Sequence, residues 1–178
     1  MKMNTVLIGN MICFAASIIM TLMGLLKDKR RFLTAQCGMN ALFAVGNYIL
    51  GGISGSIVNI VTMIRNIFCL KRKMGIWSRL IFIAVQIGLT AVAGCRDIIM
   101  WLPVIANCVF TWYMFSENMV LLKIIVIISQ FLWAAFDFSI SNYATVPFDI
   151  ASAVTNIISL ISLFKDRSGT NNENKGEV

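Results

Sequence analysis

The chain has 178 residues, of which 58% are hydrophobic and 13% are charged, and its 15 Lys and Arg outnumber its 8 Asp and Glu by seven. A mean hydropathy of +0.82 excludes a soluble domain and predicts a protein whose solvent is lipid. The basic residues stand in short clusters between apolar runs, a pattern that indicates membrane topology and excludes a nucleic-acid groove.

Residues that usually carry catalysis or hold metals are scarce. The sequence has no histidine, and its five cysteines show no CxxC spacing, so neither a metal site nor a disulfide framework is predicted. It contains no nucleotide-binding glycine loop and no nucleophile motif. We therefore expect no enzymatic activity and no bound cofactor.

Seven apolar runs are each long enough, or nearly so, to cross a bilayer, which takes about 20 residues. In chain order they cover residues 5–26, 32–50, 52–70, 77–92, 98–115, 120–140 and 146–164. Short loops join them, so the sequence predicts an all-α integral membrane fold with seven transmembrane helices in one domain, residues 1–167. The polar segment 168–178 is expected to be a disordered cytoplasmic tail.

The basic residues also predict the orientation of the helices. Clusters follow the first, third and seventh spans, whereas the opposite side of the membrane holds only Lys2 and Arg96. By the positive-inside rule the N-terminus lies outside and the C-terminus lies in the cytoplasm.

Polar residues that recur at a fixed offset indicate an internal repeat. Four of them lie at i, i+3, i+7 and i+10 in the third span, on one helix face, and four more lie 93 residues later in the seventh. The two sets are Asn59, Thr62, Asn66 and Cys69, and Ser152, Thr155, Ser159 and Ser162. Gln36 and Gln130 are offset by 94. We predict two parallel repeats, residues 5–70 and 98–164, joined by a linker helix at 77–92.

Further polar stripes on other spans predict a cavity. Amide side chains that faced lipid without partners would be costly, whereas a cavity filled with water or substrate satisfies them. The alternative is that the stripes only hold helices together, as Ser, Thr and Asn commonly do in membranes. The predicted substrate-binding residues are Gln36, Asn40, Asn47, Asn59, Thr62, Asn66, Asn107, Gln130, Trp133, Asp137, Thr155, Asn156 and Ser159.

Three stretches resemble the YgjV-type bacterial inner-membrane proteins, namely "KDKRRFLTAQ", "MIRNIFCLKRK" and "LPVIANCVFTWYMF". The similarity covers nearly the whole chain except the tail. Because that family is similar to the PQ-loop, SWEET and PnuC-like carriers, the resemblance implies a SWEET-like 3+1+3 arrangement in the bacterial inner membrane. It also implies a substrate site between spans two, three, six and seven, where this chain offers Asn40, Thr62, Trp133 and Asn156.

The chain departs from these carriers in two ways. It lacks the Pro-Gln pair in its first span that names the PQ-loop group. It also has Asn47, and Phe136 or Asp137, where members of the YgjV family have histidines. Proton coupling through histidine is therefore not carried over.

Charged residues inside the spans allow more than one interpretation. Arg65 precedes Lys71 by about 9 Å along the helix. It could therefore snorkel to the interface or cap a neighbouring helix, or it could act as a gate or an anion contact. Asp149 is expected to charge the first turn of the seventh span. Asp137 shares a stripe with Trp133 and is a candidate for proton or cation contact.

Together these features favour a small carrier or facilitator that works by alternating access. The lining is rich in amides and nearly uncharged, which favours a neutral polar metabolite such as a sugar, nucleoside or vitamin. The alternative is a membrane receptor or scaffold on the same fold that binds a ligand without passing it. The expected partners are the lipid bilayer and a small-molecule solute, with a homo-oligomer left open.

Overall fold

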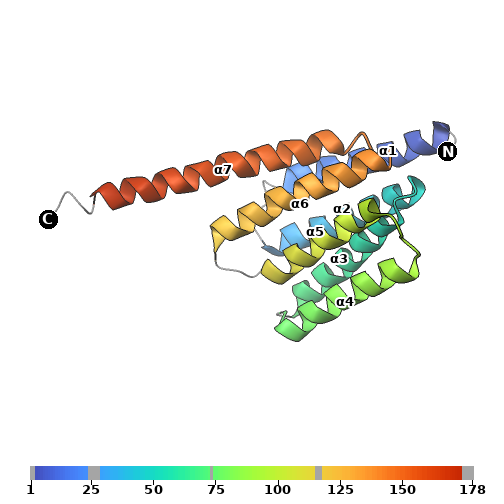
Figure 1. Cartoon of the computed structure of the whole chain (residues 1–178), viewed down its shortest axis with the longest axis horizontal. Coiled ribbons are helices and arrows are strands. Elements are labelled where there is room, and N and C mark those ends of the chain that lie inside the picture. Colours follow the sequence, from blue (N-terminus) through green and yellow to red (C-terminus); the bar gives the residue numbers. More distant parts are fainter. Residues whose placement is uncertain (1–2, 24–28, 73, 115–117, 174–178) are drawn as a thin grey trace.

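The computed structural model describes residues 3–23, 29–72, 74–114 and 118–173, which form seven helices and no strand (Figure 1). This confirms the predicted all-helical fold. The helices are α1 (Met3–Met23), α2 (Lys29–Ile49), α3 (Ile53–Lys71), α4 (Ile76–Val92), α5 (Ile98–Tyr113), α6 (Met119–Ser139) and α7 (Val146–Glu173).

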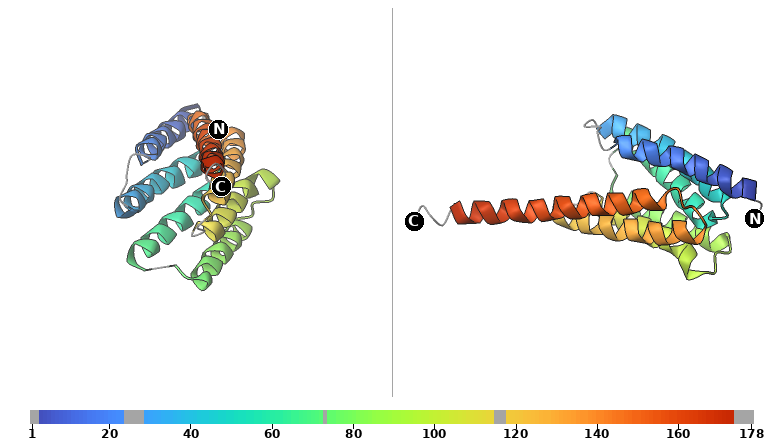
Figure 2. Two further views of the ribbon diagram at one scale, coloured as in Figure 1. Left: turned by 90° about the vertical axis from the view of Figure 1, so that its left-hand side faces the viewer. Right: turned by 90° about the horizontal axis from the view of Figure 1, so that it is seen from above.

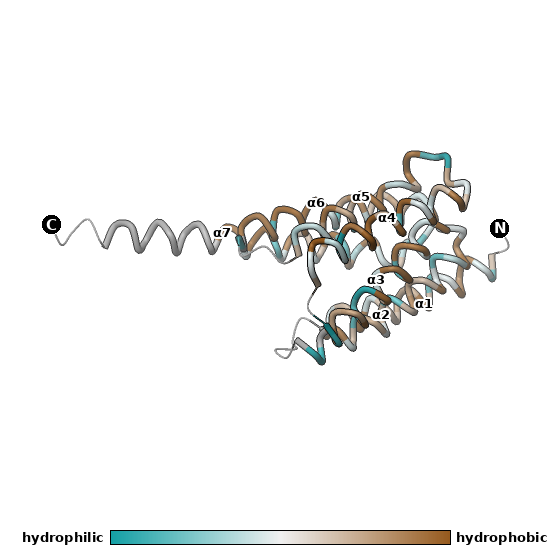
Figure 3. Tube along the Cα trace, turned by 90° about the horizontal axis from the view of Figure 1, so that it is seen from below, coloured by the Kyte–Doolittle hydropathy of each residue, from teal (hydrophilic) through white to brown (hydrophobic). Residues whose placement is uncertain are grey.

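Length and composition support membrane crossing more strongly for some helices than for others. The segments Met3–Leu22, Ile53–Lys71 and Val120–Ser139 are long and apolar enough to span, and α4, α5 and the first part of α7 are shorter apolar helices. The second helix is more polar, because it begins with basic residues and carries amides along its length, and it is paler than α6 in Figure 3. Seven complete crossings therefore stay a prediction.

The last helix is longer than predicted. It continues past residue 164 to Glu173, so part of the segment predicted to be a disordered tail is helical, and residues 174–178 lie outside the described part. Figures 1 and 2 show α7 extending beyond the other helices. An existing helix can extend through weak helix formers because propagation adds a hydrogen bond for each residue fixed.

Consecutive helices run in opposite directions, so the start of α1 and the end of α7 lie at opposite ends of the bundle (Figure 1). We call the end that holds Met3 and the connections 50–52, 93–97 and 140–145 the amino end, and the other the carboxyl end. The outside position of the N-terminus stays a prediction. Several of the basic residues on which this prediction depends are not among the described side chains, namely Lys2, Lys27, Lys29, Lys73, Lys165, Arg167 and Lys175.

The helices form two triplets that close into a ring. Helix α2 packs between α1 and α3, and α6 packs between α5 and α7, while α4 contacts α3 and α5. The triplets meet directly where α3 packs on α5. They meet again where the rings of Phe14 on α1 and Phe148 on α7 lie 5.9 Å apart, edge to face. Figure 2 (left) shows this closure end-on.

Helices α2 and α6 correspond residue by residue at a shift of 90 positions. The bounds 29–49 become 119–139, which are those of α6. Both helices end in the same hydrogen-bonded turn. The N–H of Gly52 donates to the carbonyl of Asn47 at 2.7 Å, and 90 residues later the N–H of Asn142 donates to the carbonyl of Asp137 at 2.8 Å.

Two residues with a left-handed backbone conformation also correspond at this shift, namely Gly51 with φ 83° and Ser141 with φ 62°. The offsets of 93 and 94 that the polar stripes suggested were therefore wrong by three or four residues. Such an error is about one helical turn, because polar residues on one helix face recur every three or four positions and can be matched one turn out of register.

The amino end is closed by close packing of α3 against α6. A Cβ atom on Gly55 would lie 2.5 Å from the Phe136 ring and 2.8 Å from Nδ2 of Asn47, and one on Gly52 would lie 2.7 Å from Ile140. Only glycine permits this approach, as at many helix contacts in membranes. The contact joins the first triplet to the second.

We expect Gly55→Ala to lower the free energy of unfolding by about 1–3 kcal/mol, because the added methyl group must displace a buried ring. Gly38→Ala on α2 is the matched control, since a Cβ there would meet nothing within 4 Å and alanine favours the helix. Thermal unfolding in detergent measures both variants. Equal melting temperatures would contradict the close contact of α3 with α6.

Candidate functional site: a polar cavity between the triplets

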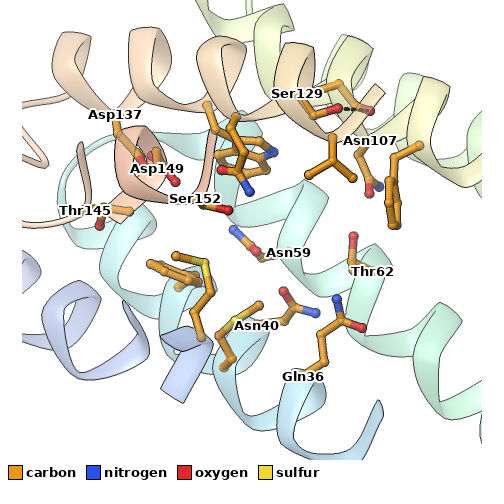
Figure 4. Close-up of a pocket in the computed structure, with 18 of the residues that line it drawn as sticks. Gln36, Asn40, Asn59, Thr62, Asn107, Ser129, Asp137, Thr145, Asp149 and Ser152 are labelled. Atoms are coloured by element: carbon orange, nitrogen blue, oxygen red, sulfur yellow. Dashed lines mark hydrogen bonds between the residues drawn. The ribbon is translucent and has the colours of Figure 1, made fainter. Parts of the chain in front are cut away.

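A cavity of about 540 Å³ lies between the two triplets (Figure 4). Its lining residues come from α1, α2, α3, α5, α6, α7 and the connection before α7, while the described part of α4 contributes none. The cavity therefore occupies the centre of the ring, and the fourth helix lies outside it.

The structure brings most of the predicted binding residues to this cavity. Those that line it are Gln36, Asn40, Asn47, Asn59, Thr62, Asn107, Gln130, Trp133, Asp137 and Asn156, and Arg65, the predicted gate or anion contact, lines it as well. The four residues implied by the carrier resemblance, one each on α2, α3, α6 and α7, are among them. Whether any of these side chains binds a substrate stays a prediction.

Three of the predicted residues do not line the cavity. Asn66 is buried behind the wall, where its Nδ2 donates to Oε1 of Gln36 at 2.9 Å. Thr155 is exposed and donates to a carbonyl of its own helix. Ser159 accepts a hydrogen bond from Nζ of Lys123 at 2.7 Å. The error on α7 follows from the offset of 93, which selected a face rotated from the one that meets the cavity. Ser162 lies outside the described side chains.

Other lining residues were not among the predicted binding residues. The polar ones are Ser129, Thr145, Asp149 and Ser152, and the apolar ones are Met20, Met39, Phe43, Ala106, Phe110 and Val126. Asp149 does lie in the first turn of α7, as predicted, and it also reaches the cavity. The shift of 90 would have found two of the polar residues, because Asn59 and Thr62 map onto Asp149 and Ser152.

Equivalent residues of the two triplets line the cavity. Eight lining residues of α1–α3 each have a partner 90 positions later that also lines it. The pairs are Met20 and Phe110, Gln36 and Val126, Met39 and Ser129, Asn40 and Gln130, Phe43 and Trp133, Asn47 and Asp137, Asn59 and Asp149, and Thr62 and Ser152. The two triplets thus present the same faces to the cavity, although the side chains on those faces differ.

Two carboxyl groups meet near the amino end of the cavity. The side chains of Asp137 and Asp149 lie side by side in Figure 4, and both are buried. Asn142 Nδ2 donates to Oδ1 of Asp137 at 3.1 Å. Two buried carboxyl groups this close repel each other when both are ionised, which favours a proton on one of them. In the first triplet the equivalent positions hold amides, Asn47 and Asn59.

Arg65 lies toward the opposite end of the cavity and does not snorkel. Its side chain is 1% exposed, and its guanidinium donates to Oγ1 of Thr111 at 2.5 Å, to Oδ1 of Asn107 at 3.4 Å and to Oδ1 of Asn66 at 3.5 Å. The ring of Phe110 lies 5.8 Å from the guanidinium carbon. The snorkelling interpretation is wrong, because the side chain is buried inside the bundle and donates to polar groups on α5.

The arginine belongs to a polar network that crosses three helices. Asn107 on α5 accepts from Arg65 and donates to Oε1 of Gln86 on α4 at 2.5 Å. Gln86 in turn donates to the carbonyl of Val104 at 3.0 Å. The network joins α3 to α5 by hydrogen bonds. It also explains why α4, which lies outside the ring, has a buried amide side chain, that of Gln86.

Asn10 on α1 joins the triplets at the amino end. Its Nδ2 donates to the carbonyl of Ser141 at 2.9 Å, and its Oδ1 accepts from the N–H of Ala144, also at 2.9 Å. Both partners belong to the connection between α6 and α7. The cavity is thus bounded by polar contacts between the triplets at both ends, Asn10 at one and Arg65 toward the other.

We expect Asn10→Ala to loosen the connection between α6 and α7. Two hydrogen bonds are lost, at about 0.5–1.5 kcal/mol each, and the Ala144 amide loses its acceptor. Hydrogen exchange at that amide should become faster, which mass spectrometry can measure. Asn4→Ala, at an exposed position of the same helix, is the control. Unchanged exchange in Asn10→Ala would show that the contact does not hold the connection.

Comparison with known proteins gives one match. The family model Imp-YgjV, described as bacterial inner membrane protein, matches residues 7–167. Neither the curated proteins nor the solved structures contain a match. The matched segment covers the whole ring of helices, so the location in the bacterial inner membrane applies to the domain that holds the cavity.

Proposed function

Because the chain belongs to the Imp-YgjV family of bacterial inner membrane proteins, we propose that it is a small carrier or facilitator for a small polar metabolite. The solute would occupy the central cavity. Movement would come from rocking of the two triplets about it, by alternating access.

The proposal rests above all on polar atoms left without partners in the cavity walls. Nδ2 of Asn40, Nε of Arg65 and Oδ2 of Asp149 are buried and make no hydrogen bond, and all three side chains line the cavity. Buried polar groups almost always have partners, and an unsatisfied one costs about 1–3 kcal/mol. An occupant with both donors and acceptors would satisfy them.

The relation between the triplets supports the rocking motion. Their lining residues correspond at a shift of 90, and one helix between them restores the direction of the chain, as expected for two parallel repeats. Among the contacts that join the triplets, those of Asn10 and Phe136 lie toward the amino end of the cavity and those of Arg65 lie toward the other end. Breaking one set while keeping the other would open the cavity to one side of the membrane.

The cavity also has a suitable size and chemistry. Its volume of about 540 Å³ falls within the range of small-molecule sites, roughly 300–1,000 Å³. Aromatic side chains, Phe43 and Trp133, lie among its amides and could stack on a ring. A metabolite that carries hydroxyl or amide groups fits such a lining.

Alternating access can be tested without knowing the solute. In a chain whose five native cysteines are replaced by alanine, Asn156→Cys places a thiol in the cavity wall. A membrane-impermeant maleimide is then applied to right-side-out and to inside-out vesicles. A carrier should react from both sides, because the cavity opens to each in turn.

The matched control is Ala153→Cys, one turn away on α7, where the side chain is 1% exposed and does not line the cavity. It should react from neither side. Labelling of Asn156→Cys from a single side would favour a receptor or scaffold on this fold. No labelling from either side would contradict both an accessible cavity and the carrier.

A further inference from the structure

The cavity contains a buried positive charge whose partners are all neutral. Arginine stays protonated at every accessible pH, and the hydrogen bonds of Arg65 go to a threonine and two asparagines. Amide and hydroxyl oxygens offset part of the cost of burying the charge. The rest requires a counter-ion, because an isolated ion in a low-dielectric interior is very costly.

The described acidic side chains do not supply that counter-ion. They are Asp97, Asp137 and Asp149, and all three lie toward the amino end. Arg65 is twelve residues into α3, about 18 Å from its start, whereas Asp149 is three residues into α7, about 4.5 Å from its start. Since both helices begin at the amino end (Figure 1), the arginine lies about 13 Å deeper than the carboxyl pair.

The fold does not need an arginine at this position. Its equivalent 90 residues later is Thr155, which is exposed and bonded to its own helix. Likewise Asn107 and Thr111, which hold Arg65, correspond to Ser17 and Thr21 on α1, whose hydroxyl groups donate only to carbonyls of their own helix. The positions on α7 and α1 that are equivalent to Arg65 and its partners therefore carry no charge.

Two N–H donors in the cavity wall, one of them on Arg65 itself, have no hydrogen-bond acceptor. Nε of Arg65 and Nδ2 of Asn40 are buried without an acceptor, and both side chains line the cavity. Asn40 lies one turn from Gln36 on α2 (Figure 4). Gln36 is joined to Arg65 through Asn66, which donates to Gln36 and accepts from the guanidinium. A fixed positive charge and unused N–H donors in the wall of one cavity are groups that proteins use to bind carboxylates and phosphates.

We propose that the solute carries an anionic group, a carboxylate or a phosphate, which binds at Arg65 and Asn40. This inference rests on the proposed carrier function and narrows its substrate class. The sequence favoured a neutral solute because the lining residues include few charges. Arg65, however, is buried and has no counter-ion among the described side chains, which makes its charge the dominant feature of this half of the cavity.

Three matched probes test the charge of the ligand. Glucose, gluconate and glucose 6-phosphate have similar bodies and differ in the anionic group. Binding raises the melting temperature of the detergent-purified chain by mass action, measured at constant ionic strength. One or both anionic probes should bind more tightly than glucose, and the two anions distinguish a carboxylate site from a phosphate site.

Arg65→Gln should weaken anion binding about ten- to a hundredfold. Lys123 is a cation outside the cavity wall, so Lys123→Gln should leave anion binding unchanged.

A second measurement needs no correct guess of the solute. In a chain with Trp77, Trp101 and Trp112 replaced by phenylalanine, the fluorescence of Trp133 reports on the cavity wall. Quenching by iodide should fall several-fold in Arg65→Gln and recover in Arg65→Lys, while quenching by neutral acrylamide stays the same. The inference would be overturned if quenching by iodide and by acrylamide fell equally in Arg65→Gln, or if quenching by iodide did not fall.

The two proposals fail in different ways. If glucose binds as tightly as its anionic analogues, or if the preference for anions survives in Arg65→Gln, the anionic class is wrong and the carrier stands. If Asn156→Cys reacts from only one side of the membrane, the carrier is wrong whatever the charge of the ligand.

Discussion

Replacing Phe136 by alanine is expected to lower the free energy of unfolding by about 3–5 kcal/mol, the usual cost of removing a fully buried aromatic ring. The side chain is 0% exposed. Its ring packs on Gly52, just before α3, and on Gly55 within it, and lies edge to face with Trp133, with centroids 5.8 Å apart. Alanine would leave a void where the triplets meet at the amino end. Chemical or thermal unfolding in detergent measures the loss.

Phe138 provides a matched control two residues away on the same helix. Its side chain is 63% exposed, so Phe138→Ala should change stability far less. A double mutant tests the contact itself. If the ring of Phe136 is what Gly55→Ala disturbs, the glycine substitution should become nearly harmless in Phe136→Ala, since contacting residues are not additive. Additive losses would show that the two positions do not interact.

The second large effect is expected for Asn107→Leu. Asn107 accepts from Arg65 and donates to Gln86, and leucine can do neither. Oε1 of Gln86 would be left buried without a donor, at a cost of about 1–3 kcal/mol, and the charged guanidinium would lose one of its three acceptors. We therefore expect a marked fall in melting temperature, together with weaker association of α3 with α5.

Thr90→Val on α4 is the control for this network. Thr90 is also buried, but its hydroxyl donates only to the carbonyl of Gln86 within its own helix at 2.9 Å. Valine should therefore cost less than the network variant. If both substitutions lower the melting temperature equally, the hydrogen bonds between helices contribute nothing beyond those within a helix.

Helix number and most helix boundaries could be predicted because apolar runs of bilayer length leave few alternatives. The linker helix, predicted at 77–92, is Ile76–Val92, and the sixth span, predicted at 120–140, is Met119–Ser139. The second helix begins at Lys29, earlier than the predicted 32. Hydropathy ends a span where charge begins, but a helix can continue with basic side chains that reach the headgroups.

The site was harder to predict than the helices. Amides that line the cavity were found because polar side chains rarely face lipid. Asp149 was assigned only to a helix start, since sequence alone does not show that the first turn of α7 faces α6. The offset of 93 selected Thr155 and Ser159 because periodic stripes match equally well one turn apart. What resolves the register is the shared turn at Gly51 and Ser141, a backbone feature that serine does not reveal in sequence.

The depths of the buried charges connect this cavity to the membrane voltage. Arg65 and the carboxyl pair of Asp137 and Asp149 lie at different levels of the bundle, so the field across the membrane acts on each in proportion to the fraction of the potential that it crosses. One elementary charge moved through the whole potential is worth about 2.3 kcal/mol per 100 mV. If the triplets rock as proposed, those fractions change even when the cavity is empty. The energized membrane would then set which side the empty protein faces, and the rate of return would depend on voltage rather than on solute alone.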